Sequence, residues 1–213
     1  MKREKYYWEN IYRTKQPEEV SWTQQVPRTS LEFIHGFQLP KTARIIDVGG
    51  GDSQLVDFLL DEGFEDITVL DISGAALENA KKRLGERAAK VNWIEQDITE
   101  FEPAAPFDCW HDRATFHFLT NEEQINKYTS TAMKSIVPAG FAVIGSFSEI
   151  GPEKCSGLPI IQYTEHSLTD RLHNGFQRIM CKREDHITPL KTRQNFLFCS
   201  FQRNRSFDRF NIK

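Results

Sequence analysis

The sequence predicts a single α/β domain of 213 residues, in which seven strands form a mostly parallel sheet with an antiparallel edge strand and helices on both faces. Three observations predict this fold. Short β-branched runs alternate with amphipathic segments between residues 43 and 146, which is typical of βαβ units. A glycine-rich turn at 49–51 directly follows the first run. Two strand-like runs without a helix between them end the sequence, and such neighbours pair antiparallel.

Residues 1–38 differ from the rest and are expected to form a helical extension or lid of the same domain. They are rich in aromatic and polar residues. Short apolar periodicity predicts a helix near 4–14, followed by a loop. Ser30 is a candidate cap for a second helix over 31–37.

The middle of the sequence predicts the alternating elements in order. Strands are expected over 43–48, 66–70, 91–95, 107–111 and 141–146. Apolar residues at helical spacing predict helices over 53–62, 74–84 and 121–137. Ser73 is positioned to cap the second of these. The last two strands, 177–187 and 195–203, are joined by a turn-forming stretch at 188–192.

Composition limits the class of protein. The apolar fraction is 39% and the charged fraction 27%, as in soluble globular domains. The net charge of −3 argues against a nucleic-acid partner, which normally needs a basic face. The N-terminus is charged and no apolar run reaches the ~18 residues of a membrane span, so we expect a cytoplasmic protein without membrane contact.

The four cysteines show no pairing pattern. They are Cys109, Cys155, Cys181 and Cys199, and no two form a CxxC pair. This spacing predicts neither a disulfide framework nor a metal site. We expect four free thiols in a reducing compartment.

The glycine turn predicts a ligand site at the end of the first strand. Asp47 ends that strand, and Gly49 and Gly51 allow a tight turn with close approach of a ligand to the backbone. A dinucleotide site needs a third small residue, but Gln54 stands at that place. Carboxylates at Asp47 and Asp52 would repel a pyrophosphate and attract an ammonium or sulfonium group. The turn therefore favours a cofactor that contains a cationic amino acid.

Two further acids follow the next two strands. Asp71 ends the second strand, about 20 residues beyond the turn, where an acid can hold ribose hydroxyls. Asp97 follows the third strand, where its side chain could accept from an adenine amino group. Each acid alone is equally explained as a turn former or helix cap. Because parallel strands end at one rim of the sheet, the three positions together predict a nucleoside-type cofactor.

These residues resemble the motifs of the class I S-adenosylmethionine-dependent methyltransferases. Ser53 departs from the commonest form, which has a third glycine there. The resemblance covers about residues 40–205 and implies a Rossmann-like sheet, S-adenosylmethionine as cofactor, and methyl transfer as the reaction. The cofactor-binding residues that it implies, together with a lid residue, are Asp47, Gly49, Gly51, Asp71, Ile72, Asp97, Ile98 and Trp22.

A narrower resemblance lies outside the core motifs. Trp8-x-x-x-Tyr12 and the segments 19–22, 111–119 and 151–159 resemble a bacterial subgroup that is similar to the mitochondrial citrate synthase lysine methyltransferase. This resemblance implies a lysine side chain as methyl acceptor.

The acceptor side is expected at the end of the fourth strand. Asp112 is the first catalytic candidate, as an orienting or proton-accepting carboxylate, and an internal ion pair with an arginine is its alternative. His117 is the second, with a packed core histidine as the alternative. Trp22 and Tyr12 could cover the sulfonium by cation–π attraction or merely pack a helix. Residues expected on the substrate side are Tyr12, His111, Arg113, Cys155 and Tyr163.

Three functions remain open from the sequence. The first is a protein-lysine N-methyltransferase, and the second is a small-molecule N-, O- or S-methyltransferase. The third belongs to another class, a nucleotide-binding module without catalysis. The expected partner is a protein or small-molecule methyl acceptor, with no metal involved.

Overall fold

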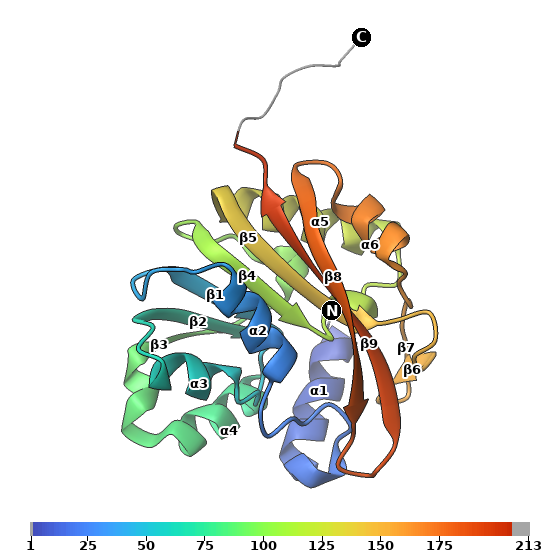
Figure 1. Ribbon diagram of the computed structural model, residues 1–213. Coiled ribbons are helices and arrows are strands. Elements are labelled where there is room, and N and C mark those ends of the chain that lie inside the picture. Colours follow the sequence, from blue (N-terminus) through green and yellow to red (C-terminus); the bar gives the residue numbers. More distant parts are fainter. Residues whose placement is uncertain (1, 206–213) are drawn as a thin grey trace.

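The computed structural model describes residues 2–205 and contains a seven-stranded sheet of order β3-β2-β1-β4-β5-β9-β8 (Figure 1). Its strands are β1 (Arg44–Val48), β2 (Asp66–Asp71), β3 (Val91–Glu95), β4 (Phe107–Arg113), β5 (Ile136–Phe147), β8 (Phe176–Ile187) and β9 (Arg193–Arg203). β1 to β5 pair in parallel, whereas β9 pairs antiparallel with both β5 and β8. The predicted fold class is confirmed, and the reversed strand lies one position in from the edge.

Helices cover both faces of this sheet. They are α1 (Lys2–Thr14), α2 (Arg28–Gly36), α3 (Leu55–Asp61), α4 (Gly74–Leu84), α5 (Glu122–Ser135) and α6 (Glu165–Leu172). α2, α3 and α4 lie on one face, and α5 and α6 on the other, while α1 lies beyond the arrowhead of β4 beside the β8–β9 hairpin (Figure 1). A two-stranded hairpin, β6 (Lys154–Cys155) and β7 (Leu158–Pro159), follows β5.

Local sequence signals account for several element boundaries. Ser73 caps α4 as predicted, since its side chain accepts from the backbone of Ala76. The prediction for Ser30 was wrong: α2 already begins at Arg28, after Pro27, so that Ser30 lies inside the helix. Pro27 lacks the N–H that a helix start leaves unused, which favours the earlier boundary.

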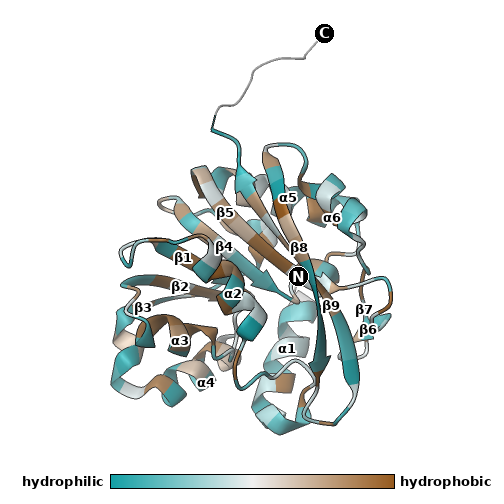
Figure 2. Cartoon of the chain, viewed as in Figure 1, coloured by the Kyte–Doolittle hydropathy of each residue, from teal (hydrophilic) through white to brown (hydrophobic). Residues whose placement is uncertain are grey.

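Two layers of core residues enclose the sheet. Trp110, Tyr128 and Leu168 are buried between the sheet and α5 and α6. Leu31, Leu55 and Leu77 are buried on the side of α2, α3 and α4. Residues of β1 and of the second half of β5 are therefore buried continuously instead of in alternation, and Figure 2 shows much of these two strands in brown.

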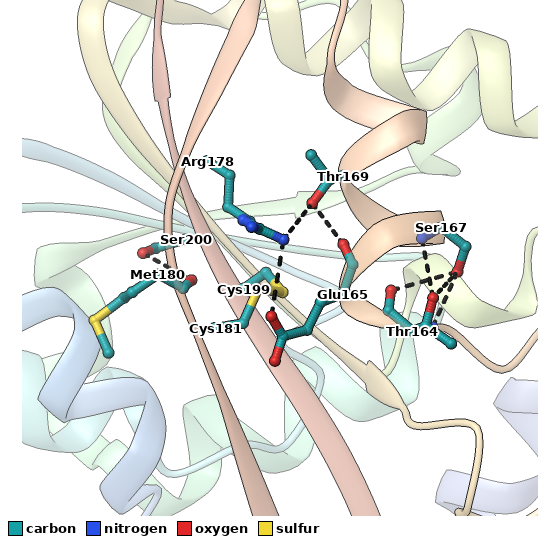
Figure 3. Close-up of a disulfide and its surroundings, with 9 residues drawn as sticks. All are labelled: Thr164, Glu165, Ser167, Thr169, Arg178, Met180, Cys181, Cys199 and Ser200. Atoms are coloured by element: carbon teal, nitrogen blue, oxygen red, sulfur yellow. Dashed lines mark hydrogen bonds and ion pairs between the residues drawn. A yellow bond between two sulfur atoms is a disulfide. The ribbon is translucent and has the colours of Figure 1, made fainter.

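A disulfide corrects the expectation of four free thiols. Cys181 in β8 is the register partner of Cys199 in β9, and their sulfur atoms are bonded (Figure 3). Beside it, the Nη1 of Arg178 donates to Thr169 of α6 at 3.3 Å and lies 3.8 Å from the Glu165 carboxylate. Spacing in the sequence does not reveal this pair, because it depends on the register of the hairpin. Cys109 and Cys155 are free and buried.

Two negative findings concern the described part of the chain. None of its helices is long and apolar enough to cross a membrane. Within residues 2–205, no group of three or more His, Cys, Asp and Glu side chains is arranged to hold a metal ion.

Candidate active site

A cavity of about 630 Å³ lies along the rim where the parallel strands end. Its lining includes Asp97 after β3, Asp71 at the end of β2, Gly49 after β1 and Arg113 at the end of β4. Because the strand order is β3-β2-β1-β4, these residues follow one another along the rim. The volume is in the range of cavities that hold small-molecule ligands.

The glycine turn packs closely against the loop after β4. Gly49 and Gly51 have φ angles of +64° and +48°, which glycine adopts without strain. A Cβ atom at Gly49 would lie 1.7 Å from the hydroxyl oxygen of Thr115. Gly49 lines the cavity, whereas Gly51 lies under Tyr12, whose hydroxyl would be 2.9 Å from a Cβ there. The backbone of the glycine turn thus lies directly at the cavity, where a ligand could contact it.

Asp71 is a buried carboxyl group at the centre of the rim. It is 6% exposed, and one oxygen accepts from the backbone N–H of Ser73 at 2.7 Å. Burial raises the pKa of Asp71 to about 7, and the charges of Asp47 and Glu9 add to this, against the Ser73 hydrogen bond. Burial also raises the pKa of the neighbouring Tyr12 hydroxyl. This end of the cavity is acidic, which suits a cationic ligand.

Asp97 lines the cavity and also caps a short helix. Its Oδ1 accepts from the backbone N–H and the hydroxyl of Thr99, at 2.9 and 2.8 Å. Asp97 therefore caps the helix, which was the alternative interpretation, and at the same time lies where the sequence predicted a ligand contact. Ile72 and Ile98 provide apolar wall on either side. Acceptor oxygens between aliphatic walls are what an adenosine group needs.

The charge of Asp52 is compensated within the protein. Arg83 binds the carboxylate of Asp52 and lies 2.9 Å from that of Asp57. The argument for a cationic ligand therefore depends on Asp47 and Asp71.

Asp47 belongs to a buried network that sequence reasoning missed. Its Oδ1 lies 2.7 Å from Nδ1 of His111, whose Nε2 lies 2.8 Å from the hydroxyl of Ser30. The three residues are 3%, 2% and 1% exposed. Asp47 and His111 are register partners in β1 and β4, which are not consecutive strands. No sequence signal could have shown this pairing, and it connects the cavity to α2.

Aromatic side chains of the N-terminal segment cover the cavity. We call residues 2–27, which comprise α1 and the following loop, the roof. The rings of Trp8 and Trp22 lie 5.7 Å apart, Trp22 lies 6.0 Å from Tyr12, and Trp8 lies 5.1 Å from Phe118. All four line the cavity, so that the predicted positions of Tyr12 and Trp22 lie together.

Hydrogen bonds attach the roof to both sides of the rim. On the α4 side, Asn79 donates to the backbone carbonyl of Tyr12 at 3.2 Å. On the hairpin side, Nε2 of His186 donates to the carbonyl of Ser21 at 2.8 Å. The Tyr7 hydroxyl donates to the Ser156 carbonyl after β6. These attachments hold the aromatic rings over the cavity.

The two predicted catalytic residues do not lie at the cavity. Asp112 is fully buried on the α5 side, where it accepts from the Tyr128 hydroxyl at 2.6 Å and from the backbone N–H of Thr115 at 2.9 Å. Burial raises its pKa to about 6. Successive residues of a strand point to opposite faces, so Arg113 lines the cavity and Asp112 does not. These contacts attach Asp112 to the loop that carries Thr115, and its catalytic role stays a prediction.

His117 is likewise a packed core residue. Its Nδ1 accepts from the backbone N–H of Phe147 at 3.3 Å, and burial lowers its pKa to about 3. Tyr163, expected on the substrate side, is 1% exposed and lies beside Ser148, away from the cavity. Neither position fits the predicted role, because neither side chain lines the cavity.

The end of the cavity away from Asp97 is formed by a set that we call the distal wall: Trp8, Trp22, Arg113, Phe118 and Cys155. Burial raises the pKa of the Cys155 thiol to about 12, so the thiol is neutral and no nucleophile. Residues that sequence reasoning did not single out also line the cavity, namely Gln24, Asn79, Thr115, Leu158 and Pro159. The motifs of the narrower resemblance contain Trp8 and Phe118 as well as Thr115, Leu158 and Pro159, whereas Gln24 and Asn79 gave no signal.

Comparisons with known proteins agree with this geometry. Residues 45–140 match the family described as methyltransferase domain. A curated relative, the eEF1A lysine and N-terminal methyltransferase of Mus musculus, is 30% identical over 121 residues, which are 56% of this chain and 17% of that protein. The chain thus spans less than a fifth of the length of the first such relatives.

Two further proteins are similar over more of their length. The malonyl-[acyl-carrier protein] O-methyltransferase 1 of Ilyobacter polytropus is 26% identical over 164 residues, 72% of this chain and 59% of that protein. The crystal structure of the N-methyltransferase NodS of Bradyrhizobium japonicum WM9 with S-adenosylhomocysteine superimposes with a TM-score of 0.73 at 16% identity, covering 93% of this chain and 98% of that one. Family match, fold and rim motifs agree on a methyltransferase domain at residues 45–140 within a Rossmann-like fold, with S-adenosylmethionine as its cofactor.

Proposed function

We propose that the protein transfers a methyl group from S-adenosylmethionine to a small-molecule acceptor. The observation that carries this proposal is one roofed cavity that runs from Asp97 and Asp71, past the glycine turn, to the distal wall. A cavity that is covered in part by its own N-terminal segment suits an acceptor that is small enough to fit beneath that segment. We propose that residues 1–38 are an extension of a single domain and that the roof is the part of this extension that covers the cavity. Met1 lies outside the described residues.

The chain's side chains match the chemistry of this cofactor. We propose that Asp71 accepts from the ribose hydroxyls and that Asp97 and Ile98 hold the adenine. Asp47 and the glycine turn would take the amino-acid part, because a carboxylate attracts an ammonium group. Tyr12 and Trp22 would cover the sulfonium, since aromatic faces attract cations.

When bound, S-adenosylmethionine supplies an electrophilic methyl group. The residues of the cavity would position the acceptor in line with it and exclude water. None of the five residues of the distal wall is a carboxylate or an imidazole, and the imidazole of His111, which also lines the cavity, is held between Asp47 and Ser30. This favours an acceptor that arrives with a free lone pair, such as an anionic oxygen or sulfur or an aromatic amine.

A protein lysine is the second candidate acceptor. The name of the mouse relative, eEF1A lysine and N-terminal methyltransferase, favours it. The guanidinium of Arg113 opposes it, because a cation in the distal wall repels an ammonium group. The name of the bacterial relative, an O-methyltransferase, agrees better with an oxygen acceptor.

Transfer of label from radioactive S-adenosylmethionine tests the proposal. Purified protein is incubated with a cell extract that has been separated into a small-molecule and a protein fraction. We expect label in the small-molecule fraction, and much less label with the Asp71→Asn variant at a limiting concentration of the cofactor. A labelled protein band, without a labelled small molecule, would support the lysine acceptor. Calorimetry tests the non-catalytic class: binding of NAD without binding of S-adenosylhomocysteine would contradict both candidates.

His111→Leu is expected to weaken binding of S-adenosylhomocysteine about tenfold, since Asp47 loses the partner that orients its carboxylate. His111→Asn keeps a donor near the Nδ1 position and should restore much of the affinity. Isothermal titration of both variants, combined with Asp47→Asn, gives the coupling between the two positions, for which we expect about 1–2 kcal/mol. Additive effects would show that His111 acts on the fold alone.

A further inference from the structure

Arg113 presents a buried cation that has no ion-pair partner among the described residues. Its Nη1 donates to the backbone carbonyl of Trp22 at 2.9 Å, and its guanidinium carbon lies 4.5 Å from the ring centre of Phe196. Its Nε and Nη2 are buried and have no hydrogen-bond partner. A guanidinium has five N–H donors, so most of this group's donors are unused.

Within residues 2–205, no acidic side chain forms an ion pair with Arg113. The charges of Glu184 and Asp47 do act on Arg113 from a distance. The carboxylate of Glu184 accepts from Gln24 of the roof at 2.8 Å. Burial lowers the pKa of Arg113 to about 10, so the group stays protonated at neutral pH. A buried charge without a partner is costly, and the position implies a counter-charge from elsewhere.

The surroundings of Arg113 offer hydrogen-bond donors and apolar surface. The Cys155 thiol is neutral, and Trp8, Trp22 and Phe118 contribute aromatic rings. His117 lies close enough for the Arg113 charge to help lower its pKa. The free nitrogens of Arg113, beside aromatic walls, match an anion that is attached to an apolar or aromatic body.

We propose that the methyl acceptor carries an anionic group of the carboxylate class, and that this group binds Arg113. The inference depends on the proposed function and names its substrate class. Both free nitrogens are buried, and the neighbouring Nη1 binds the carbonyl of Trp22, so we expect the anion to reach them when the segment at Trp22 moves aside. Binding of the acceptor is thereby coupled to movement of the roof. Arg113 lies beyond the glycine turn from Asp71 and Asp97, on the acceptor side of the rim.

Benzoate and benzamide are matched probes for this site, since they share one shape and differ in charge. We expect benzoate to bind the protein loaded with S-adenosylhomocysteine at least about tenfold more tightly than benzamide, as measured by titration calorimetry or ligand-observed NMR. Arg113→Met should abolish the difference, and Arg178→Gln, on exposed β8, should preserve it. Equal binding of the two probes to the wild-type protein would overturn the inference, whatever the variants do.

The carboxylate of the cofactor is the other anion that Arg113 could bind. A second pair of ligands distinguishes this carboxylate from that of the methyl acceptor. 5′-Methylthioadenosine lacks the amino-acid part of S-adenosylhomocysteine. We expect Arg113→Met, and Arg113→Lys as a charged alternative, to leave the affinity ratio of these two ligands unchanged. A selective loss for S-adenosylhomocysteine would assign Arg113 to the cofactor and overturn the inference. Loss of all nucleoside binding by the wild-type protein would instead refute the proposed function.

Discussion

Asp71→Asn is expected to weaken binding of S-adenosylhomocysteine by roughly 10- to 100-fold and, at the same time, to stabilise the ligand-free protein. Ribose hydroxyls would lose a charged acceptor, an interaction of about 1.5–3 kcal/mol. The stabilisation has the opposite sign because the native fold buries this carboxyl group, at 6% exposure, close to Asp47 and Glu9. A neutral amide avoids the cost of ionising there, while its oxygen can still accept from Ser73.

The pH dependence of both effects follows from the raised pKa of Asp71, from 3.8 to about 7. Below pH 4 the group is neutral in the folded and the unfolded chain, and it contributes no difference. Between pH 4 and 7 the unfolded chain ionises first, so the free energy of unfolding falls as the pH rises, and the full loss is present above pH 7. Cofactor affinity runs the other way, since an ionised carboxylate is the better acceptor.

Thermal unfolding between pH 4 and 8 measures this. At pH 8 we expect Asp71→Asn to raise the free energy of unfolding by about 2 kcal/mol, which corresponds to roughly 4–8 °C in Tm. The difference should vanish near pH 4. Asp170→Asn, on the exposed surface of α6, serves as the matched control and should change neither Tm nor affinity. A lower Tm for Asp71→Asn at pH 8 would contradict the assigned cost of burial.

Gly49→Ala is expected to remove measurable cofactor binding and to destabilise the fold by about 2–4 kcal/mol. The new Cβ would lie 1.7 Å from the Thr115 hydroxyl oxygen and 2.9 Å from its Cβ, so that the turn or the loop must move. Overpacking of this kind typically costs about 1–3 kcal/mol, and the left-handed backbone adds about 1 kcal/mol. A displaced turn no longer brings its backbone to the amino-acid part of the cofactor.

Gly63→Ala is the matched control for Gly49→Ala. Gly63 has a φ of +85°, but no atom lies within 4 Å of a Cβ there. This variant should therefore lose only the roughly 1 kcal/mol of backbone strain and keep its affinity. Chemical denaturation and calorimetry of both variants separate strain from crowding. If Gly49→Ala loses no more stability than Gly63→Ala, the contact with Thr115 is not tight in solution.

The grouping of the three acids along one rim was predictable from the sequence because topology alone brings them together. Parallel strands end at one rim, so acids that follow three successive strands must be neighbours, as Asp47, Asp71 and Asp97 are. The acceptor half was predicted less well, because it depends on which way single side chains of β4 point. Asp112 and Arg113 are adjacent in sequence and face opposite sides of the sheet.

Local sequence patterns could not predict contacts between segments that are distant in the sequence. Ser30 looked like a helix cap and instead binds His111, 81 positions away. The Cys181–Cys199 pair depends on the register of a hairpin that turn chemistry alone does not fix. In each case the physical cause is a neighbour that the fold supplies and that spacing along the chain does not reveal.

The attachments of the roof have a consequence for how the protein is made. Ser21 and Gln24 are held by His186 and Glu184, residues 165 and 160 positions later. During synthesis the roof leaves the ribosome before the β8–β9 hairpin does. The residues that hold Ser21 and Gln24 are therefore absent until this hairpin has emerged. The strand ends that we assign to the nucleoside, up to residue 98, are complete far earlier. A growing chain could thus assemble its nucleoside pocket well before it can enclose a methyl acceptor, and any variant that delays hairpin formation should prolong that open stage.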